Sequence, residues 1–150
     1  MNTSELSQTI TIARVKTRPG LIASAKTFRI ICDDTGLHVI HLGRAMGTKV
    51  KSNDPIANKL AEVMTNKMEA KMESALRDAE RELEGCTLNQ MLTRKHSFSV
   101  PFTETGAVRY EAGTGSDTVL VIKSRAAKTK LLGTLAERNA FESIARRFQS

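Results

Sequence analysis

The sequence predicts an α+β protein in which antiparallel strands are interrupted by one long helix and closed by an amphipathic C-terminal helix. Residues 54–84 contain neither Gly nor Pro after Pro55, and short alternating apolar segments bounded by turn residues lie on both sides. Residues 135–148 repeat apolar side chains at helical spacing. A chain of 150 residues is long enough for its own core, so we expect a single domain over 1–150 with 54–92 as a helical insertion.

The N-terminal part of the chain predicts strands. Residues 8–16 (QTITIARVK) alternate Thr and Ile; over 9–16 a helix is the alternative, which the β-branched side chains disfavour. Residues 27–32 and 37–42 form a predicted hairpin around Gly36. Its second strand is apolar on both faces, so we expect the sheet core to cover one face and the long helix the other.

The long helix has sequence signals at both ends. Asp54 suits the N-cap, Pro55 the first helical position and Gly85 the residue past the end. About 31 residues in one helix span roughly 46 Å. At 100° per residue, one narrow stripe of small and flexible apolar side chains runs along it: Ala57, Ala61, Met64, Met68, Met72, Ala75, Ala79 and Leu83.

Strand signals resume after this helix. A capping box at Thr87 and Gln90 predicts a helix of one or two turns. Strands are then expected at 97–102, where Pro101 indicates an edge, and at 106–112, 118–123 and 128–132. A second capping box, Thr134 with Glu137, begins the helix at Leu135 that runs to about Phe148, with Ala140, Phe141, Ile144, Ala145 and Phe148 on its apolar face.

These elements carry a resemblance to a known family. The stretch FRIICDDTGLHVIHLG (28–43), the segment 97–102 followed by Val108, residues 120–123 and the helix around Phe141 together resemble bacterial PH-like domains. The resemblance covers about two-thirds of the chain. It implies a small antiparallel barrel-like sheet capped by the C-terminal helix, with residues 54–92 as an insertion, and a role as a binding or assembly module.

The formal net charge of +7 is unevenly distributed. Residues 54–84 hold five Lys and Arg against eight Asp and Glu, a net of −3, and the rest of the chain holds 18 against eight, a net of +10. A positive charge of this kind attracts anionic partners. Alternatively, it only keeps the protein soluble. The densest basic cluster, Lys123, Arg125, Lys128 and Lys130, is our candidate for contact with nucleic acid or an acidic lipid surface, the alternative being a solvated face.

The apolar stripe of residues 54–84 has two possible uses, packing on the chain's own sheet or self-association. Strands of six or seven residues span only about 20–23 Å, so about half of the helix has no sheet of its own chain beneath it. We therefore expect the stripe to be shared between the sheet and a second copy in a nearly straight antiparallel pair. The candidate self-association residues are Met64, Met68, Met72, Ala75, Ala79 and Leu83.

The sequence offers little for catalysis or metal binding. His38 and His41 are three residues apart, which on a strand places their rings on opposite faces, so no metal is expected. Gly43 to Lys49 has the wrong order and spacing for a phosphate loop. No Ser, Cys or His has a motif partner. We expect no enzyme activity, no cofactor and no small-molecule substrate.

The cellular compartment is predicted from the cysteines and the N-terminus. Cys32 and Cys86 are far apart, which favours reduced thiols, and the polar start MNTSELSQT argues against a secretory signal. No apolar run reaches the length of a membrane span. The sequence thus predicts a cytoplasmic, non-enzymatic module acting through protein–protein contact or self-association, or alternatively through anion binding by a basic β face.

Overall fold

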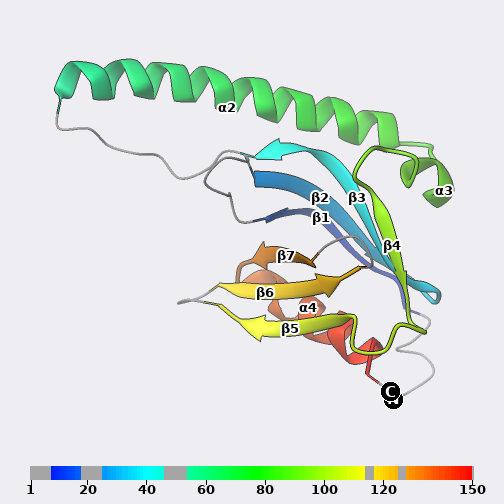
Figure 1. Ribbon diagram of the computed structural model, residues 1–150. Helices are drawn as coiled ribbons and strands as arrows, with labels where there is room; N and C mark the ends of the chain where they lie inside the picture. Colours follow the sequence, from blue (N-terminus) through cyan, green and yellow to red (C-terminus); the bar gives the residue numbers. More distant parts are fainter. Residues whose placement is uncertain (1–7, 18–24, 46–53, 114–116, 125–127, 150) are drawn as a thin grey trace.

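The computed structural model describes residues 8–17, 25–45, 54–113, 117–124 and 128–149 (Figure 1). Its centre is one seven-stranded antiparallel sheet with the order β4-β3-β2-β1-β7-β6-β5. The strands are β1 Ile10–Thr17, β2 Ala25–Cys32, β3 Gly36–Ala45, β4 Phe98–Pro101, β5 Val108–Ala112, β6 Thr118–Lys123 and β7 Lys128–Gly133. The strand interpretation of the first segment is therefore confirmed, and β4, which contains Pro101, is an edge strand as predicted.

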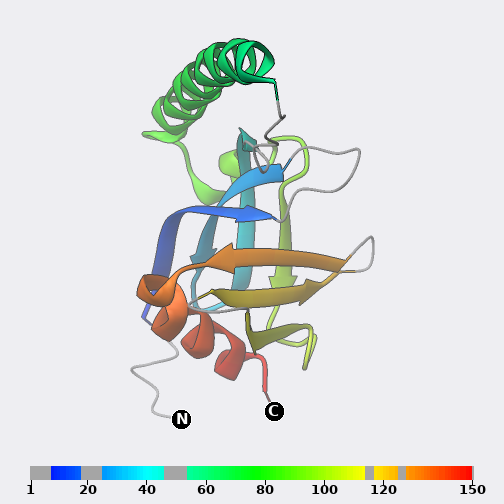
Figure 2. The same ribbon diagram turned by 90° about the vertical axis from the view of Figure 1, so that its left-hand side faces the viewer.

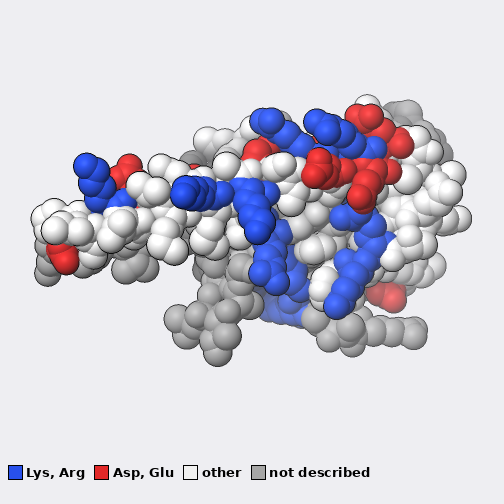
Figure 3. Space-filling view, turned by 90° about the horizontal axis from the view of Figure 1, so that it is seen from above, with Lys and Arg blue, Asp and Glu red and all other residues white. Residues whose placement is uncertain are grey.

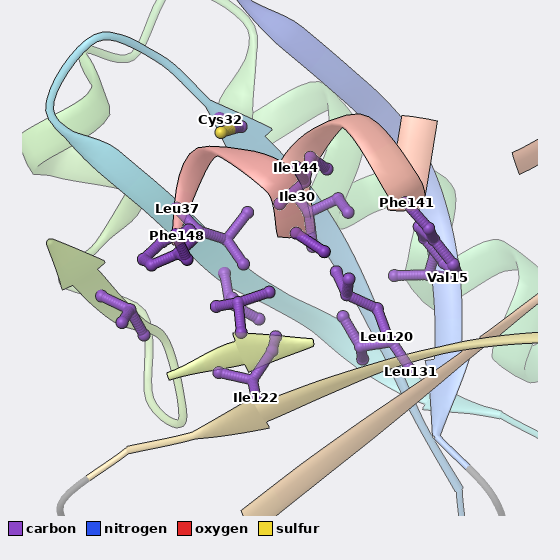
Figure 4. Packing of buried hydrophobic residues seen from close by; sticks show 14 of the residues in the cluster. Val15, Ile30, Cys32, Leu37, Leu120, Ile122, Leu131, Phe141, Ile144 and Phe148 are labelled. Atoms are coloured by element: carbon purple, nitrogen blue, oxygen red, sulfur yellow. The ribbon is translucent and has the colours of Figure 1, made fainter. Parts of the chain in front are cut away.

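The sheet curls strongly, so that β1 to β4 and β5 to β7 face each other across a common interior (Figure 2). The C-terminal helix α4, Leu135–Arg147, packs against β5 and β6 and begins with the predicted capping box. Its residues Phe141, Ile144 and Phe148 are buried in the main core (Figure 4). The α+β class, the antiparallel curled sheet and the two predicted helices are thus confirmed.

The main core is mostly aliphatic and contains a few aromatic rings. It joins both halves of the sheet to α4 through Val15, Phe28, Ile30, Cys32, Leu37, Val39, Val100, Val108, Leu120, Ile122, Leu131, Phe141, Ile144, Ala145 and Phe148. Phe102 packs on Phe148 with ring centroids 4.8 Å apart. Cys32 lies inside this core, where burial raises the pKa of its thiol, and both cysteines are free.

A second, smaller core joins the long helix α2, Pro55–Leu83, to the outer face of β3. Ile40 and Leu42 of the strand pack there against Leu76, Ala79 and Leu83. A methyl group added to Gly43 would lie 3.1 Å from Leu76 Cδ2, so the glycine permits this close approach. The prediction that β3 is covered on both faces is confirmed.

The ends of α2 follow the sequence signals. The side chain of Asp54 accepts a hydrogen bond from the backbone N–H of Ile56, and Gly85 has a φ of +77° just past the helix. The short helix α3, Leu88–Met91, follows with its capping box formed. Both helices lie between β3 and β4 in the chain, as the prediction of an inserted segment requires.

Only the C-terminal half of α2 lies on the sheet, and the N-terminal half projects beyond it (Figure 1). The residues of α2 that are buried are Leu76, Ala79 and Leu83. The sequence predicted one continuous stripe that outruns the sheet toward Leu83, and this was wrong. The apolar contacts with the sheet are made by Leu76, Ala79 and Leu83 over Ile40 and Leu42, and in the described part of the chain no residue of the first four turns is buried.

Candidate functional site

The free half of α2 carries most of the exposed apolar surface found in the described part of the chain. Five large side chains are exposed: Ile56 by 72%, Leu60 by 62%, Val63 by 48%, Met64 by 65% and Met68 by 49%. At 100° per residue they cover a face about 140° wide. We call these five residues the apolar patch. Seen from above, this half of α2 is largely uncharged, whereas charged side chains crowd the other half (Figure 3).

The structure divides the predicted self-association residues between two environments. Met64 and Met68 belong to the apolar patch, and Ala75 is also exposed. Ala79 and Leu83 are buried against the chain's own sheet, and Met72 is half-buried. The structure therefore does not bring the six residues together on one accessible surface.

The sequence reasoning missed the rest of the apolar patch. Ile56 and Val63 were outside the predicted stripe, and Leu60 was placed only at its margin. Their spacing of four and three residues was the available signal, since it marks a second face in the first half of the helix. A single stripe drawn along all of α2 averaged two different faces.

A groove separates the middle of α2 from strands β1 to β3. Its volume is about 530 Å³. Cationic and hydroxyl side chains come from the sheet, and acidic and apolar ones from the helix: Arg14, Lys16, Thr27, Arg44, Asn66, Glu69, Ala70, Met72, Glu73 and Leu76. We call this the α2 groove. It lies on the side of the helix turned away from most of the apolar patch, as their positions on the helical wheel require.

An ion-pair network closes one end of the α2 groove. The guanidinium of Arg14 lies 2.8 Å from Glu73 Oε2 and also pairs with Glu80, which Arg29 approaches at 3.3 Å. The hydrogen bonds from Arg14 lower the pKa of the Glu73 and Glu80 carboxyls and raise that of Arg14 itself. Glu80 is therefore engaged within the chain.

The rest of the α2 groove contains polar groups without partners in the described part of the chain. Thr27 is 1% exposed and its hydroxyl has no hydrogen bond. Lys16 and Arg44 are exposed and form no ion pair with any described residue. A buried hydroxyl without a hydrogen bond is uncommon in folded proteins and calls for a physical explanation.

The predicted basic cluster lies elsewhere, on β6 and β7. Lys123 is directly opposite Lys128 in the strand register, and Lys130 follows two residues later on the same face. All three are exposed. Arg125 lies outside the described residues. The three lysines therefore share one face of the hairpin, and they are not part of the α2 groove.

His38 forms an arrangement that the sequence analysis did not find. Its Nδ1 is 2.7 Å from Ser99 Oγ, and its Nε2 is 3.0 Å from Asp33 Oδ1. Burial opposes ionisation of Asp33, but hydrogen bonds from Thr35 and His38 outweigh it and lower the pKa of this carboxyl to about 2. The partners are a turn residue and a cross-strand neighbour, so only the folded register reveals them.

The side chains of Ser99, His38 and Asp33 are linked in the same order as those of a hydrolase triad. Their surroundings, however, are those of a structural contact. His38 is 7% exposed and pairs with Ser99 in the β3–β4 ladder. None of the three residues lines the α2 groove or the other two cavities described for this chain. A triad needs a substrate cavity and oxyanion donors beside the serine. We interpret the contact as a tie between the β2–β3 turn and the edge strand.

His41 lies on the other face of β3, as predicted. Its ring packs edge-on against Phe28 at a centroid distance of 5.4 Å and against His96 at 5.3 Å. Burial, together with nearby positive charge, lowers the pKa of His41 to about 4. Among the described residues, no three His, Cys, Asp or Glu side chains are grouped as a metal site would require.

Comparisons with known proteins add no assignment. Among the described helices, none combines the length and the apolar character that a membrane crossing requires. No protein-family model, curated protein or solved structure matches the chain.

Proposed function

We propose that the protein is a non-enzymatic assembly module of the PH-like type, located in the cytoplasm, that forms a homodimer through the apolar patch of α2. The observation that carries this is the exposure of five large apolar side chains on a helix that leaves the sheet. Two further features support the PH-like type. The sheet curls until its last strand pairs with its first, and the C-terminal helix packs against β5 and β6, which is consistent with the capped, barrel-like sheet that the resemblance implies.

The apolar patch calls for a partner. A contiguous apolar surface on a free helix favours association, because water is released when the surface is covered. Within the described residues, the first half of α2 also has no buried side chain of the kind whose packing normally stabilises a helix. A partner lying along it would supply them. The projection of this half beyond the sheet leaves space for a second chain (Figure 1).

A second copy of the same chain fits the order of side chains along the helix. In an antiparallel pair centred on Met64, this residue meets its own equivalent and Leu60 meets Met68. Lys67 then lies opposite Ala61, and Lys71 lies opposite Ala57. Small side chains thus face the long lysine stems, whose ammonium groups reach water. No like charges are directly opposed at the centre of this interface.

The expected dimer is of modest affinity. The free part of α2, about 17 residues, is roughly 25 Å long. A single helix pair of that length lies at the small end of specific interfaces, so we expect dissociation constants in the micromolar range. The dimer should depend little on salt, because apolar contacts dominate it.

Sedimentation of single-site variants tests the proposal. Met64→Glu places two carboxylates face to face on the two-fold axis, and should give a folded monomer. Ser74→Glu is the matched control, because it makes the same charge change at an exposed position of α2 outside the apolar patch. We use Met64 rather than Met72, which is half-buried in the chain itself. A wild-type protein that is monomeric at high micromolar concentration, or a Met64→Glu protein that stays dimeric, contradicts the proposal.

The basic face of β6 and β7 supports a second candidate function, binding of nucleic acid or an acidic membrane surface. The favouring observation is the direct opposition of Lys123 and Lys128, since an anion would relieve the repulsion between them. Replacing Lys123, Arg125, Lys128 and Lys130 with Gln should weaken such binding and reduce its salt dependence. A wild-type protein that binds neither single-stranded DNA nor acidic vesicles at low salt removes this candidate.

A further inference from the structure

We propose that the α2 groove binds a small anionic molecule, held through a phosphate or carboxylate group by Lys16, Arg44 and the hydroxyl of Thr27. The three residues line one groove and lie on three successive strands. A volume of about 530 Å³ is in the range of small-molecule sites. The proposal is independent of dimerisation, because the groove and most of the apolar patch lie on different sides of α2.

On the floor of the groove a lysine, a threonine hydroxyl and a glycine backbone lie side by side on neighbouring strands. Lys16 of β1 is directly opposite Thr27 of β2, which in turn is directly opposite Gly43 of β3. Directly opposed residues of a sheet point to the same face. Gly43 has no side chain, and a Cβ placed there would meet Leu76 of α2 at 3.1 Å.

The charges of the groove leave a positive site on the sheet side. Arg14 is neutralised by Glu73 and Glu80. Neither Lys16 nor Arg44 forms an ion pair with a described residue. An anionic group bound between these two would gain charge-assisted hydrogen bonds. The Thr27 hydroxyl is buried and has no hydrogen-bond partner among the described residues, and a ligand oxygen that reached it would accept a further one.

The helix side of the groove restricts the ligand to a small molecule. Glu69 and Glu73 face the sheet cations from α2, so a polyanion that filled the groove would meet like charge. The helix α2 also stands above β1 to β3 (Figure 2), which keeps a flat bilayer surface away from the groove beneath it. A compact molecule with one terminal anionic group can pair with the cations of the sheet. It avoids the like charge of the helix carboxylates and fits beneath the helix.

Thr27→Val separates binding from folding. Valine has nearly the same shape but lacks the hydroxyl, which forms no hydrogen bond in the free protein. Removing a buried polar group that has no partner costs little and can stabilise the fold. We therefore expect Thr27→Val to melt at or above the wild-type temperature and to bind anions several-fold more weakly.

The experiment is a titration of the full chain with pyrophosphate and, separately, with citrate, followed by NMR amide shifts. We expect saturable shifts centred on Lys16, Thr27 and Gly43. Lys16→Gln with Arg44→Gln should weaken binding by about tenfold or more. The matched control, Lys123→Gln with Lys128→Gln, makes the same charge change on the other half of the sheet and should leave affinity within about twofold.

Three results would overturn the proposal. The first is the absence of saturable shifts in the groove with either anion. The second is an equal loss of affinity in the two double variants, which would mean that net charge alone attracts the ligand. The third is a Thr27→Val protein that binds as the wild type does. Binding of a single-stranded oligonucleotide or acidic vesicles through the same residues, without binding of pyrophosphate or citrate, would also refute a small-molecule site.

Discussion

The packing of Phe141 against Gly133 gives a sharp prediction about the C-terminal helix. Phe141 is 0% exposed, and its ring lies where a methyl group on Gly133 would approach Cε2 to 2.8 Å. Phe141→Ala removes the ring from a closed core, so we expect a loss of about 3–5 kcal/mol in the free energy of unfolding. With a urea m-value of about 2 kcal/mol/M, the midpoint should fall by roughly 2 M.

Gly133→Ala provides the coupled half of the test. In the wild type the added methyl group would clash with the Phe141 ring and with Glu137 Cβ at 3.0 Å, so it should cost about 1–3 kcal/mol. In the Phe141→Ala background the ring is gone, and the same change should cost clearly less. Leu135→Ala, at a 60% exposed position of α4, is the control and should change stability by less than about 0.5 kcal/mol.

The measurement is urea unfolding followed by circular dichroism for the wild type, three single variants and the Phe141→Ala, Gly133→Ala double variant. A loss below about 1 kcal/mol for Phe141→Ala would show that α4 is peripheral. Strictly additive costs would show that Gly133 and Phe141 are not in contact. Either result would refute the packing described here and weaken the PH-like interpretation.

Three other predictions concern charge and reactivity. Glu80→Gln should lower stability more than Glu73→Gln in chemical denaturation. Each carboxylate meets two arginines, but Glu80 is less exposed than Glu73, and its second partner Arg29 is more buried than Arg77, the second partner of Glu73; equal effects would contradict this. Burial lowers the pKa of His41 to about 4, whereas a histidine in the unfolded chain has a pKa of about 6.5. Between these two values the unfolded state binds a proton that the folded state does not. Stability should therefore fall as the pH decreases from about 6.5 to about 4. His41→Gln should reduce that loss in thermal melts, and an unchanged pH profile would speak against it. Ser99 should not be labelled by a fluorophosphonate probe at neutral pH, and stoichiometric labelling detected by mass spectrometry would show a catalytic serine instead.

Local sequence signals predicted much of the secondary structure. The capping boxes at Thr87 and Thr134 and the Asp54–Pro55 start are decided by nearby residues, so they were readable directly. The two-sided apolar pattern of β3 also predicted that a helix would cover it. The helix starts depend on residues within a few positions of each other, and the covering of β3 depends on the pattern of apolar residues along that single strand.

The sites depended on contacts that a linear pattern does not specify. The sequence did not show which half of α2 would lie on the sheet, because apolar residues occur at helical spacing in both halves. The tertiary partners Ile40 and Leu42 decide it. Likewise, Thr27, Lys16 and Arg44 come from three strands: the register places Lys16 opposite Thr27, and only the folded sheet beneath α2 brings Arg44 to the same groove. The tie between His38 and Ser99 spans 61 residues for the same reason.

Disulfide cross-linking at Met64 tests the central claim, the antiparallel pairing of two α2 helices, most directly. In a Cys86→Ser background, Met64→Cys places one thiol on the two-fold axis opposite its equivalent, whereas Lys59→Cys places a thiol on the back of the same helix. The account predicts rapid, nearly complete disulfide dimers for Met64→Cys under mild oxidation, and little cross-linking for Lys59→Cys. Equal cross-linking at the two positions, or more at Lys59→Cys, would contradict it.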